Sequence, residues 1–592
     1  MNITKVEPPN WWAGMKLNKI QLMVYGKDLD NAKAFFNDNQ VKVLAVHNAE
    51  SLSYLFVDIE IPSDIKPGSY KLTLKKNGIE KVVNFPILAR QNDAGKYQGF
   101  NNEDVLYLIM PDRFADGDAS NNVVKGMPDE CDVQNPIARH GGDIQGIIDH
   151  LDYLKNLNIS TLWICPVLEN NTDVHYYGYA GYSATDLYKV DARLGTNELY
   201  KKLVDDVHAK GMKIILDHVS NHISISHPWM NDLPFADWIN GSVKQHLATR
   251  HDKLAFADIH RDSSTIINTT KGWFTNYLPD LNQANPYVSN YLIENTIWWI
   301  ESTGLDGIRE DTYPYSDQIY LSNWAKTILE EYPKLNIVGE VWTGDAVFLS
   351  SFQKGNYYPR QIDSNLPAVT DFSTYDTYTA FLRGKAGLQN IYEDYAKDFI
   401  YGNPQNLVTF MDNHDVGRAL MQAGGDVKKF EMVVTMLLTS RGIPELFYGT
   451  EIGMMGGNDD GTVRSDFPGG FAGDKHNAFT KEGRTKSEDI IYDYLSTLLN
   501  LRKEHKALSE GKLIQYPPVD NVFVYFKNYD NDRVMVIMNN NSDEKEIDLS
   551  RFSDQLKDVK NIKNLTTGKT YNFTDNSINV ESESGNLFLL LK

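Results

Sequence analysis

The sequence has very little cysteine and no long hydrophobic run. Its 592 residues include only two cysteines, Cys131 and Cys165. Two thiols are too few for a disulfide framework or for a tetrahedral zinc site built from cysteine. Cys165 lies inside the apolar run TLWICPV and is predicted to be a buried thiol. No apolar run approaches the roughly 18 residues that a transmembrane helix needs, so no membrane span is expected.

Positive charge is also scarce. The chain carries 58 Lys and Arg residues against 79 Asp and Glu residues, which gives a formal net charge of −21. An acidic protein repels polyanions, so nucleic acid is not expected as a partner. The same charge suits a neutral substrate and tolerates bound cations.

The two ends of the chain have the patterning of β-sheet domains. Segments near the N-terminus, such as LNKIQLMVYG and YLFVDIEI, alternate apolar and polar residues between Gly and Pro. We therefore expect a β-sandwich over 1–95 and a C-terminal all-β sandwich over 506–592. Trp11 and Trp12 pack between domains or stack on a sugar, and packing is the favoured interpretation.

The central segment, 96–505, repeats strand and helix. Short apolar runs such as KIILDHV alternate with amphipathic runs such as ELYKKLVDDVHAKG, which Gly211 is expected to end as a C-cap. About eight such units predict an α/β fold, a (β/α)₈ TIM barrel with right-handed crossovers. A stretch at about 220–285 interrupts the pattern and predicts a loop domain inserted after the third strand.

Carboxylates follow several predicted strands directly. Asp311 ends GIRED, Glu340 lies in NIVGEVW and Asp415 ends FMDNHD. The carboxyl ends of barrel strands form the active-site face, so these acids are expected to converge. Glycosidic bond cleavage needs one carboxylate and one carboxylic acid. Arg309, on the same strand face as Asp311, is expected to lower the pKa of Asp311, and the charge of Asp311 is expected to keep Glu340 protonated.

Other polar residues at these strand ends are candidates for positioning and binding. In DHVSNH, Asp217 is expected to buttress Arg309 and His222 to bind a sugar; His414 precedes Asp415. A histidine at such a place is also compatible with a purely structural role. The joint arrangement of acidic and histidine-bearing strand ends favours function.

A polar loop, DRFADGDASNN, together with the later GGD, offers oxygen ligands. Asp116, Asp118, Asn121 and Asn122 carry hard donors, which suit calcium rather than zinc. The loop is not an EF-hand, because the glutamate at the end of that motif is absent. A polar turn without metal is the alternative.

These segments resemble the signature segments of the α-amylase family, glycoside hydrolase family 13. DHVSNH, GIRED, GEVW and FMDNHD stand in the family's order, and LPDLN (Leu278–Asn282) and GYSATDLY (Gly181–Tyr188) resemble two accessory segments. The N-terminal β domain, the RFADGD…GGD stretch and DGTVRSDFPGG (Asp460–Gly470) are similar to the cyclomaltodextrinase and neopullulanase branch.

The resemblance implies roles for individual residues. Asp311 would be the nucleophile, Glu340 the acid/base and Asp415 the transition-state stabiliser. Substrate binding would involve Arg309, His222, His414, Tyr182, Asp217 and Trp342. Calcium would be held by Asp116, Asp118, Asn121, Asn122, the carbonyl of Gly142 and Asp143.

The chain departs from the family pattern at three places. Ala180 stands where the family usually has a histidine, so a hydrogen bond to the sugar is missing or comes from His175. Glu310 replaces a residue that is often apolar; strand alternation points it toward the helices, where it needs a partner. Asn122 stands at a calcium position where aspartate is frequent, which would reduce affinity.

The expected reaction is retaining hydrolysis of α-1,4-glucosidic bonds in cyclodextrins, pullulan and maltooligosaccharides. Retention predicts a separation of roughly 5–5.5 Å between the two catalytic carboxyl groups. A transglycosylase or a glucosyl isomerase on the same fold is the alternative. MNITKVEPPNWW does not read as a signal peptide. Because relatives in the branch are often exported, we expect a periplasmic or secreted protein whose signal was removed, with the cytoplasm as the alternative. The sequence also leaves open whether the protein forms a homodimer.

Overall fold

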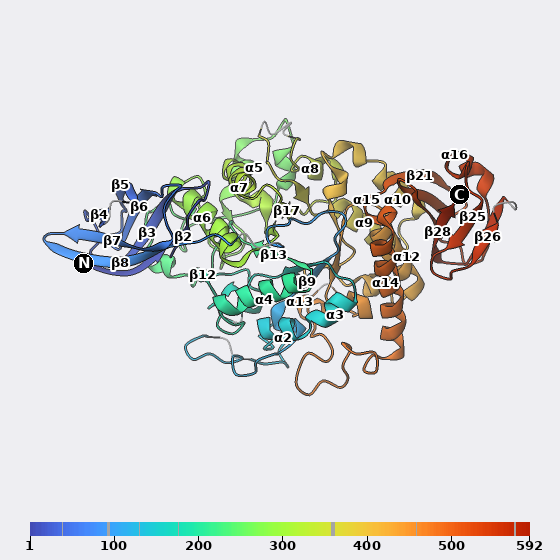
Figure 1. Cartoon of the computed structure of the whole chain (residues 1–592), viewed down its shortest axis with the longest axis horizontal. Coiled ribbons are helices and arrows are strands. Elements are labelled where there is room, and N and C mark those ends of the chain that lie inside the picture. Colours follow the sequence, from blue (N-terminus) through green and yellow to red (C-terminus); the bar gives the residue numbers. More distant parts are fainter. Residues whose placement is uncertain are drawn as a thin grey trace.

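The computed structural model describes residues 1–37, 40–91, 95–128, 131–173, 175, 177–356, 362–457, 459–572 and 576–592. Figure 1 shows the chain running from β-sheets at the left, through a central barrel covered by helices, to β-sheets at the right. The barrel therefore lies between two β domains, as the sequence patterning predicts.

Eight parallel strands form the barrel. In the sheet they follow the order β18-β17-β16-β13-β10-β9-β20-β19. A parallel bridge between Thr370 and Val408, with the Asp371 N–H donating to the Val408 carbonyl at 2.8 Å, joins the two end strands. The strands are β9 (Leu106–Ile109), β10 (Thr161–Ile164), β13 (Lys213–His218), β16 (Gly307–Glu310), β17 (Asn336–Gly339), β18 (Ala368–Val369), β19 (Val408–Thr409) and β20 (Ile443–Phe447).

Helices follow the strands and cover the outside of the barrel. The run GGDIQGIIDHLDYLKNLN has apolar residues at a helical period and predicts one helix over 144–157, but the structure divides it in two at His150. Gly211 closes α4 in the left-handed conformation with φ 69°, as expected. On α6 the side chain of Asn285 caps the N-terminus and Gly304, with φ 93°, ends the helix. The helices are α1 (Pro111–Phe114), α2 (Ile144–Asp149), α3 (Leu151–Asn156), α4 (Asn197–Ala209), α6 (Pro286–Thr303), α7 (Gln318–Glu331), α8 (Ala346–Ser350), α9 (Phe372–Leu382), α10 (Leu388–Tyr395), α11 (Ala419–Gln422), α12 (Val427–Thr439), α13 (Asp460–Val463), α14 (Lys486–Glu504) and α15 (Lys506–Glu510).

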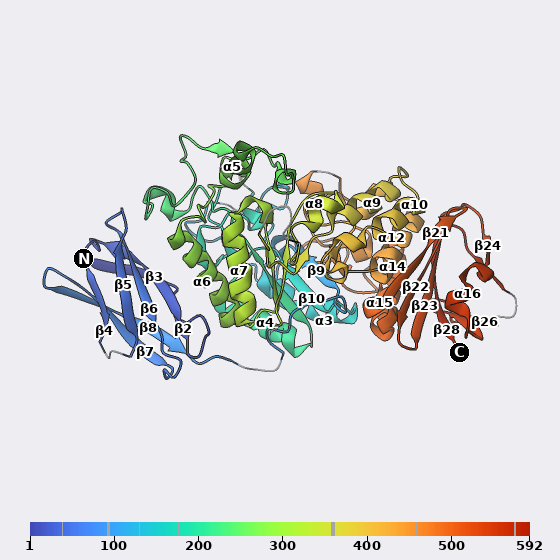
Figure 2. The same ribbon diagram turned by 90° about the horizontal axis from the view of Figure 1, so that it is seen from above.

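The insertion lies between the third barrel strand, β13, and α6, where the sequence predicts it. It contains the short helix α5 (Ser263–Lys271) and a two-stranded parallel sheet of β14 (Leu247–Ala248) and β15 (Gly272–Trp273). Short 3-10 turns lie at Pro228–Asn231 and Lys253–Phe256. In Figure 2 the part with α5 stands at the top edge, above α6 and α7.

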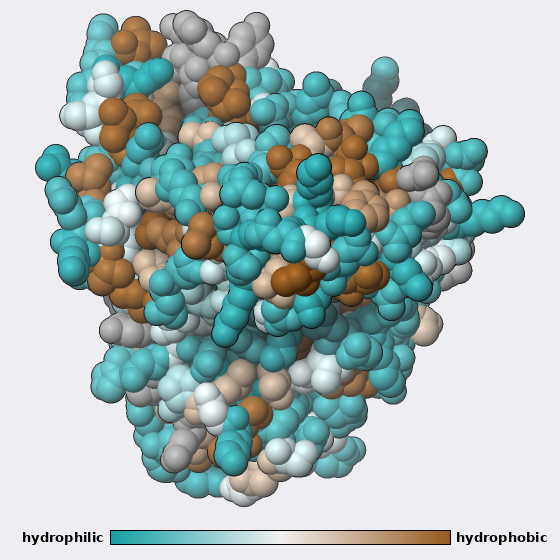
Figure 3. All heavy atoms as spheres, turned by 90° about the vertical axis from the view of Figure 1, so that its left-hand side faces the viewer, coloured by the Kyte–Doolittle hydropathy of each residue, from teal (hydrophilic) through white to brown (hydrophobic). Residues whose placement is uncertain are grey.

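The N-terminal domain is a sandwich of two four-stranded sheets, β1-β3-β6-β5 and β2-β8-β7-β4. Trp11 and Trp12 are buried in β2, which favours packing over stacking on a sugar. Viewed from this end, the surface carries small apolar patches separated by hydrophilic side chains (Figure 3). The strands are β1 (Asn2–Glu7), β2 (Trp11–Trp12), β3 (Lys19–Lys27), β4 (Lys33–Phe36), β5 (Lys42–Asn48), β6 (Tyr54–Glu60), β7 (Gly68–Lys76) and β8 (Ile79–Leu88).

The C-terminal domain is built on a six-stranded sheet, β21-β22-β23-β28-β25-β26, with a separate pair, β24 and β27. The run NVFVYFKNYDNDRVMVIMNNN predicts a hairpin, which the structure forms from β22 and β23, paired antiparallel from Val522 to Asn539. The domain is tied to α12 by the hydroxyl pair of Thr439 and Tyr525 at 2.6 Å. Its elements are β21 (Lys512–Val519), β22 (Val522–Tyr529), β23 (Asp532–Asn539), β24 (Lys545–Asp548), α16 (Ser553–Leu556), β25 (Asn561–Asn564), β26 (Thr570–Asn572), β27 (Ser577–Val580) and β28 (Ser584–Leu591).

The helices of the described ranges include none that is both long and apolar enough to cross a lipid bilayer. This agrees with the expectation from the apolar runs of the sequence.

Candidate active site

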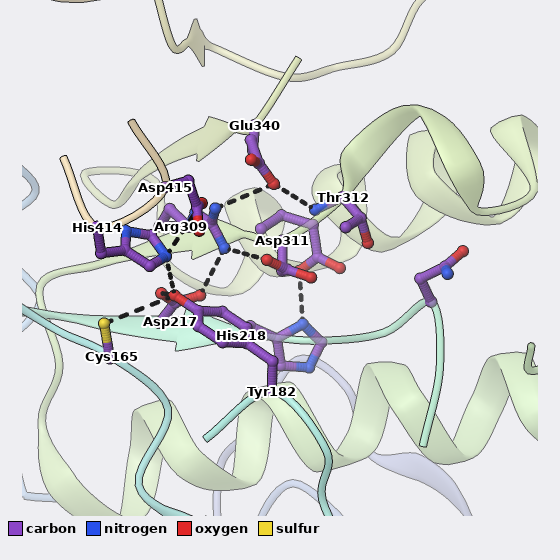
Figure 4. Close-up of polar contacts among 12 residues, drawn as sticks. Cys165, Tyr182, Asp217, His218, Arg309, Asp311, Thr312, Glu340, His414 and Asp415 are labelled. Carbon is purple, nitrogen blue, oxygen red and sulfur yellow. Dashed lines mark hydrogen bonds and ion pairs between the residues drawn. The ribbon is translucent and has the colours of Figure 1, made fainter. Parts of the chain in front are cut away.

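Arg309 lies at the centre of the acid cluster at the carboxyl edge of the barrel (Figure 4). Its Nη1 is 2.5 Å from Oδ1 of Asp311 and 2.9 Å from Oδ1 of Asp217, while its Nη2 is 3.0 Å from Oε2 of Glu340. The register explains this meeting, because Asp217 on β13 pairs with Arg309 on β16, next to β17. One guanidinium group thus joins acids that lie far apart in the sequence.

The Glu340 carboxylate is also held by the backbone. The N–H of Thr312 donates to its Oε2 at 2.9 Å. Thr312 adopts a left-handed conformation with φ 43°, which is unusual for a β-branched residue and aims this N–H at the acid. The strained position directly after Asp311 therefore fixes one acid relative to the other.

A pocket of about 340 Å³ opens above these acids. It brings together seven of the residues that the sequence nominates for catalysis or substrate binding: Asp311, Glu340, Asp415, Tyr182, His222, His414 and Trp342. The remainder of its wall comes from Tyr177, Ala180, Ser183, Phe274, Tyr277, Leu278, Thr312, Asp460 and Arg464.

Asp217 and Arg309 lie beneath the pocket rather than in its wall. Asp217 is buried and accepts hydrogen bonds from Arg309, from Trp163 Nε1 at 2.9 Å and from Tyr182 Oη at 2.8 Å. It therefore buttresses Arg309, as its position in the sequence suggests, and also orients the pocket-lining ring of Tyr182. Cys165 is buried beside that ring, with Sγ 3.6 Å from Tyr182 Oη, as expected for a structural thiol.

Asp415 and His414 form the opposite wall. Nε2 of His414 lies 2.8 Å from Tyr182 Oη and 3.2 Å from Oδ2 of Asp415, and Arg464 donates to Oδ1 of Asp415 at 2.9 Å. Burial opposes ionisation of Asp415, but His414 and the guanidinium groups of Arg464 and Arg309 outweigh it, so the pKa of Asp415 lies below its usual value. Asp415 is consequently a stable anion at neutral pH.

Asp311 and Glu340 titrate differently from Asp415. Burial raises the pKa of Asp311 to about 7, and Arg309 offsets this only in part. Burial likewise raises the pKa of Glu340 to about 7, with Arg309 lowering it and Asp311 raising it. The sequence analysis correctly predicts that Arg309 lowers the pKa of Asp311. It does not include burial, which raises this pKa by more than Arg309 lowers it. Both carboxyl groups contact the same guanidinium, and the charge of Asp311 raises the pKa of Glu340, so the two titrations are linked.

The two pocket histidines are neutral. Burial lowers the pKa of His222 to about 4 and that of His414 to about 3. His222 Nε2 lies 3.0 Å from the Tyr182 carbonyl and Nδ1 lies 3.2 Å from Asn221 Nδ2, so both ring nitrogens already have protein partners. His222 therefore shapes the wall next to Tyr182.

The buried carboxylate of Glu310 has hydrogen-bond partners, as a buried charged group requires. Its carboxylate is completely buried, lies 2.5 Å from Nδ1 of His218 and accepts from the N–H and hydroxyl of Ser220. His218 in turn lies 2.9 Å from Thr296 Oγ1 on α6 and stacks on Trp324 of α7. The side chain points to the helix layer, as strand alternation predicts.

At Ala180 the sequence leaves two alternatives: the hydrogen bond to the sugar is missing, or His175 supplies it. The structure favours the missing hydrogen bond. Ala180 lines the pocket, whereas His175 is exposed and bonds its neighbour Asp173 at 2.6 Å. His175 is therefore not among the described residues that line the pocket.

Several pocket residues were not singled out from the sequence. Arg464 and Asp460 lie in the DGTVRSDFPGG segment, which was recognised as a motif but given no role. Their ion pair at 3.2 Å places a cation against Asp415. No sequence pattern predicted that Thr312 and Phe274 line the pocket, because hydroxyl groups and aromatic rings are common in loops.

The predicted calcium loop presents oxygen atoms that lack hydrogen-bond partners. Oδ1 of Asp116, of Asn121 and of Asn122 are all buried and unpaired among the described residues. Gly141 lies against the Asn122 amide, since a Cβ there would approach it to 2.7 Å. Three unpaired buried acceptors in one loop fit a hard cation such as calcium.

Asp143 and Asp118, two of the other predicted ligands, already accept hydrogen bonds. Both carboxylate oxygens of Asp143 accept hydrogen bonds, from Gly117, Gly146, Asp118 and Asn121, and Asp118 Oδ1 accepts from Ser120. Gly142 packs against Pro111 and Asp112. In the described part of the chain no group of three His, Cys, Asp or Glu side chains forms a metal site, so amide and backbone oxygens would have to complete this one.

A closed parallel barrel with this cluster of acids at its carboxyl edge defines a class, the barrel glycosidases. The catalytic-domain model described as alpha amylase matches residues 108–511, and models of the cyclomaltodextrinase N-terminal and cyclo-malto-dextrinase C-terminal domains match 5–91 and 513–587. The chain belongs to the alpha-amylase family of glycosidases.

Individual relatives agree with this assignment. A cyclomaltodextrinase from a Bacillus species is 29% identical over 448 residues, covering 74% of this chain and 72% of the relative. The crystal structure of an Anoxybacillus alpha-amylase is 29% identical with a TM-score of 0.69, covering 83% of this chain and 98% of that one. A cyclomaltodextrinase structure with a TM-score of 0.65 and 20% identity covers 98% of this chain and 97% of that one, and so shows the shared three-part fold.

Proposed function

We propose that this enzyme is a retaining glycoside hydrolase that cleaves α-1,4-glucosidic bonds in cyclodextrins, pullulan and maltooligosaccharides. The observation that carries the proposal is the Arg309 bridge, which holds Asp311 and Glu340 at the base of one pocket. The similarity to a cyclomaltodextrinase over most of the chain supports the substrate class.

Glycosylation of the enzyme uses the two coupled acids. Glu340 donates its proton to the glycosidic oxygen while the Asp311 carboxylate attacks the anomeric carbon, so the leaving sugar departs as an alcohol. Arg309 contacts both groups and holds their relative position. This step needs the form of the pair in which Glu340 carries a proton and Asp311 is ionised.

The second step returns the enzyme to its starting state. Glu340, now a carboxylate, takes a proton from water, and the water oxygen attacks the anomeric carbon and expels Asp311. Asp415, an anion whose pKa is held low, stabilises positive charge on the sugar ring in both steps. Trp342, with 44% of its surface exposed and its ring stacked on Phe372, gives the sugar an apolar face.

We also propose that the loop with Asp116, Asn121 and Asn122 holds calcium, supported by its three unpaired oxygens. Calcium there would supply structural cross-linking and no reaction step. The loop is connected to the pocket, because Arg113 donates both to Asp112 and to the carbonyl of Arg464. Ordering this loop therefore helps to place the guanidinium of Arg464 beside Asp415.

The deciding experiment offers α-, β- and γ-cyclodextrin, pullulan and starch in parallel and analyses the products and their anomeric form by NMR. The proposal expects α-anomers as first products and the fastest turnover on cyclodextrin or pullulan. First-formed β-anomers, or action on sucrose or trehalose alone, would overturn it in favour of an inverting enzyme or an isomerase.

Compartment and assembly are separate proposals. Pullulan is a polymer that does not cross membranes, so its use as a substrate would place the enzyme outside the cytoplasm, periplasmic or secreted; cyclodextrin or maltooligosaccharide use alone is compatible with the cytoplasm. Cell fractionation decides between these. Light scattering tests whether the enzyme is a homodimer.

A further inference from the structure

The active-site pocket continues past Glu340 into a second chamber of about 290 Å³. Its wall is formed by His251, Lys253, Phe274, Thr312, Tyr315, Glu340 and Trp342. Phe274, Thr312, Glu340 and Trp342 line both spaces, whereas Asp311 and Asp415 line only the first. The second chamber therefore lies on the side of the acid that faces away from the nucleophile. That is the side where the leaving sugar must lie when Glu340 protonates the glycosidic oxygen.

The insertion supplies two polar side chains of this chamber, His251 and Lys253. Lys253 Nζ donates to Tyr315 Oη at 3.1 Å, and Nδ1 of His251 lies 2.9 Å from the same hydroxyl. The rings of His251 and Phe274 pack edge-on against Tyr315, which fixes the position of the hydroxyl. Lys253 is thus held at a defined place by residues of two different segments.

The Lys253 ammonium has N–H donors that no described residue accepts from. No carboxylate of the described residues lies within ion-pair distance of its Nζ, although the chain as a whole has a large excess of acids. An ammonium carries three N–H donors, and Tyr315 accepts one of them. Burial of the side chain lowers the pKa of Lys253, which is the cost of keeping the ammonium in this wall. A half-buried ammonium with unused donors at a pocket wall is suited to sugar hydroxyl groups.

We propose that Lys253 binds the sugar unit on the leaving-group side of the cleaved bond and is a specificity-determining residue for that unit. The inference rests on the proposed function. Phe274, Tyr315 and Trp342 offer ring faces for the apolar side of a sugar, while Lys253 donates to its hydroxyls. The chemistry favours a neutral sugar, because Glu340 and Asp252 lie near Lys253 and would repel an anionic one.

The same chamber holds the acceptor in transglycosylation. An acceptor sugar bound there gives its hydroxyl proton to the Glu340 carboxylate, its oxygen bonds to the anomeric carbon, and the bond to Asp311 breaks. Water competes for the same intermediate. Lys253 transfers no proton in this step and acts only by holding the acceptor, so it sets the ratio of transfer to hydrolysis.

The test compares two substrates in the purified full-length enzyme. Maltotriose has a sugar leaving group, and an aryl α-maltoside has a leaving group without hydroxyls for Lys253. Lys253→Met keeps the length of the side chain and removes its donors. We expect kcat/KM on maltotriose to fall roughly 10- to 100-fold, at least about tenfold more than on the aryl maltoside, as for loss of a charge-assisted hydrogen bond. The ratio of transfer to hydrolysis with maltose as acceptor should fall as well.

Two further variants sharpen the comparison. Lys253→Arg keeps the positive charge and should restore part of the maltotriose activity. Lys244→Met removes an exposed lysine of the same insertion that lines neither chamber, and it should behave as the wild type on both substrates. Thermal melting of each variant checks folding.

Equal losses on the two substrates, or an unchanged transfer ratio in Lys253→Met, would overturn the inference while leaving the proposed function intact. Wild-type enzyme that cleaves neither substrate, and also none of cyclodextrin, pullulan and starch, would overturn both together.

Discussion

Nδ1 of His218 lies 2.5 Å from Oε2 of Glu310, in the buried layer directly behind the strand ends that carry Asp217 and Asp311. His218 and Glu310 are register partners on β13 and β16, each one residue along from Asp217 and Arg309. The N–H of Asp311 donates to the His218 carbonyl at 2.8 Å. The two strand ends are therefore tied together both by backbone and by a side-chain pair on the face opposite the pocket.

Removing one member of this pair should destabilise the protein strongly. Glu310→Leu removes the acceptor of His218 Nδ1 and of the N–H and hydroxyl of Ser220, and we expect a loss of about 3–5 kcal/mol in the free energy of unfolding. The double variant Glu310→Leu/His218→Leu removes both polar groups and should recover much of that loss. Denaturant unfolding of the wild type, both single variants and the double variant gives the coupling. Purely additive losses would show that the pair does not act as a unit.

Asp311→Asn should abolish turnover without unfolding the protein. The carboxylate that forms the covalent bond is lost, while the amide oxygen can still accept from Arg309, so we expect kcat to fall by about 10⁴-fold or more. The assay is reducing-sugar release from cyclodextrin, with Asp64→Asn, an exposed acid of the N-terminal domain, as the control. Activity of Asp311→Asn near the wild-type level, in a preparation free of contaminating enzyme, would remove Asp311 from the mechanism.

Glu340→Gln should make the protein more stable than the wild type at high pH. Burial raises the pKa of Glu340 to about 7 in the folded protein, from an ordinary value of 4.5. The stability that the protonated form contributes is complete below about pH 4.5 and is lost as pH rises through about 7. Glutamine cannot ionise, so the advantage of the variant should grow between these pH values and level off above them, at about 1–3 kcal/mol.

Urea unfolding of Glu340→Gln and wild type at pH 4.5, 6 and 8 measures this difference. The side-chain amide oxygen of the variant would still be able to accept from Thr312 and Arg309, so the comparison isolates the charge. A difference that does not change with pH would mean that Glu340 titrates near its ordinary pKa.

Calcium removal should lower the melting temperature, and Asn122→Asp should enlarge that effect. The wild-type amide of Asn122 donates to Oδ2 of Asp116 at 2.8 Å. Aspartate at this position would lose this donor and repel Asp116 when no metal is bound, but would bind a cation more tightly when one is present. Melting curves with excess calcium and with EDTA test this through linkage.

Magnesium serves as the control cation in that experiment, since its smaller, stricter octahedral coordination suits this loop less well. Melting curves that coincide with calcium and with EDTA, for both proteins, would leave the loop as a polar turn without metal.

The barrel and the acids at its edge could be predicted from the sequence because each buried strand is a short apolar run that ends in a polar motif. Strand β18, Ala368–Val369, was missed, because two residues carry no periodicity and its position depends on β17 beside it. The helix over 144–157 was predicted as one element since its apolar period continues across His150, where the backbone departs from helical geometry.

Contacts between distant segments account for what the sequence could not show. Strand alternation gave the direction of Glu310, but its partner His218 lies 92 residues away and only the pairing of β13 with β16 brings them together. Lys253 belongs to an insertion without hydrophobic periodicity, so no pattern places it near Glu340. The pKa of Asp311 likewise depends on burial, which a local reading of Arg309 and Asp311 does not contain.

The N-terminal sandwich supports the insertion directly. Phe56 of β6 stacks on Phe235 with ring centroids 5.5 Å apart, and Glu50 accepts from the N–H of Ala236 at 2.7 Å. Deleting the whole N-terminal domain would therefore expose the ring of Phe235 to solvent. It would also remove contacts that hold the insertion, to which Lys253 belongs. With the role proposed for Lys253, a truncated enzyme is expected to be altered in its choice of sugar acceptor, which would make the β-sandwich a remote contributor to substrate binding.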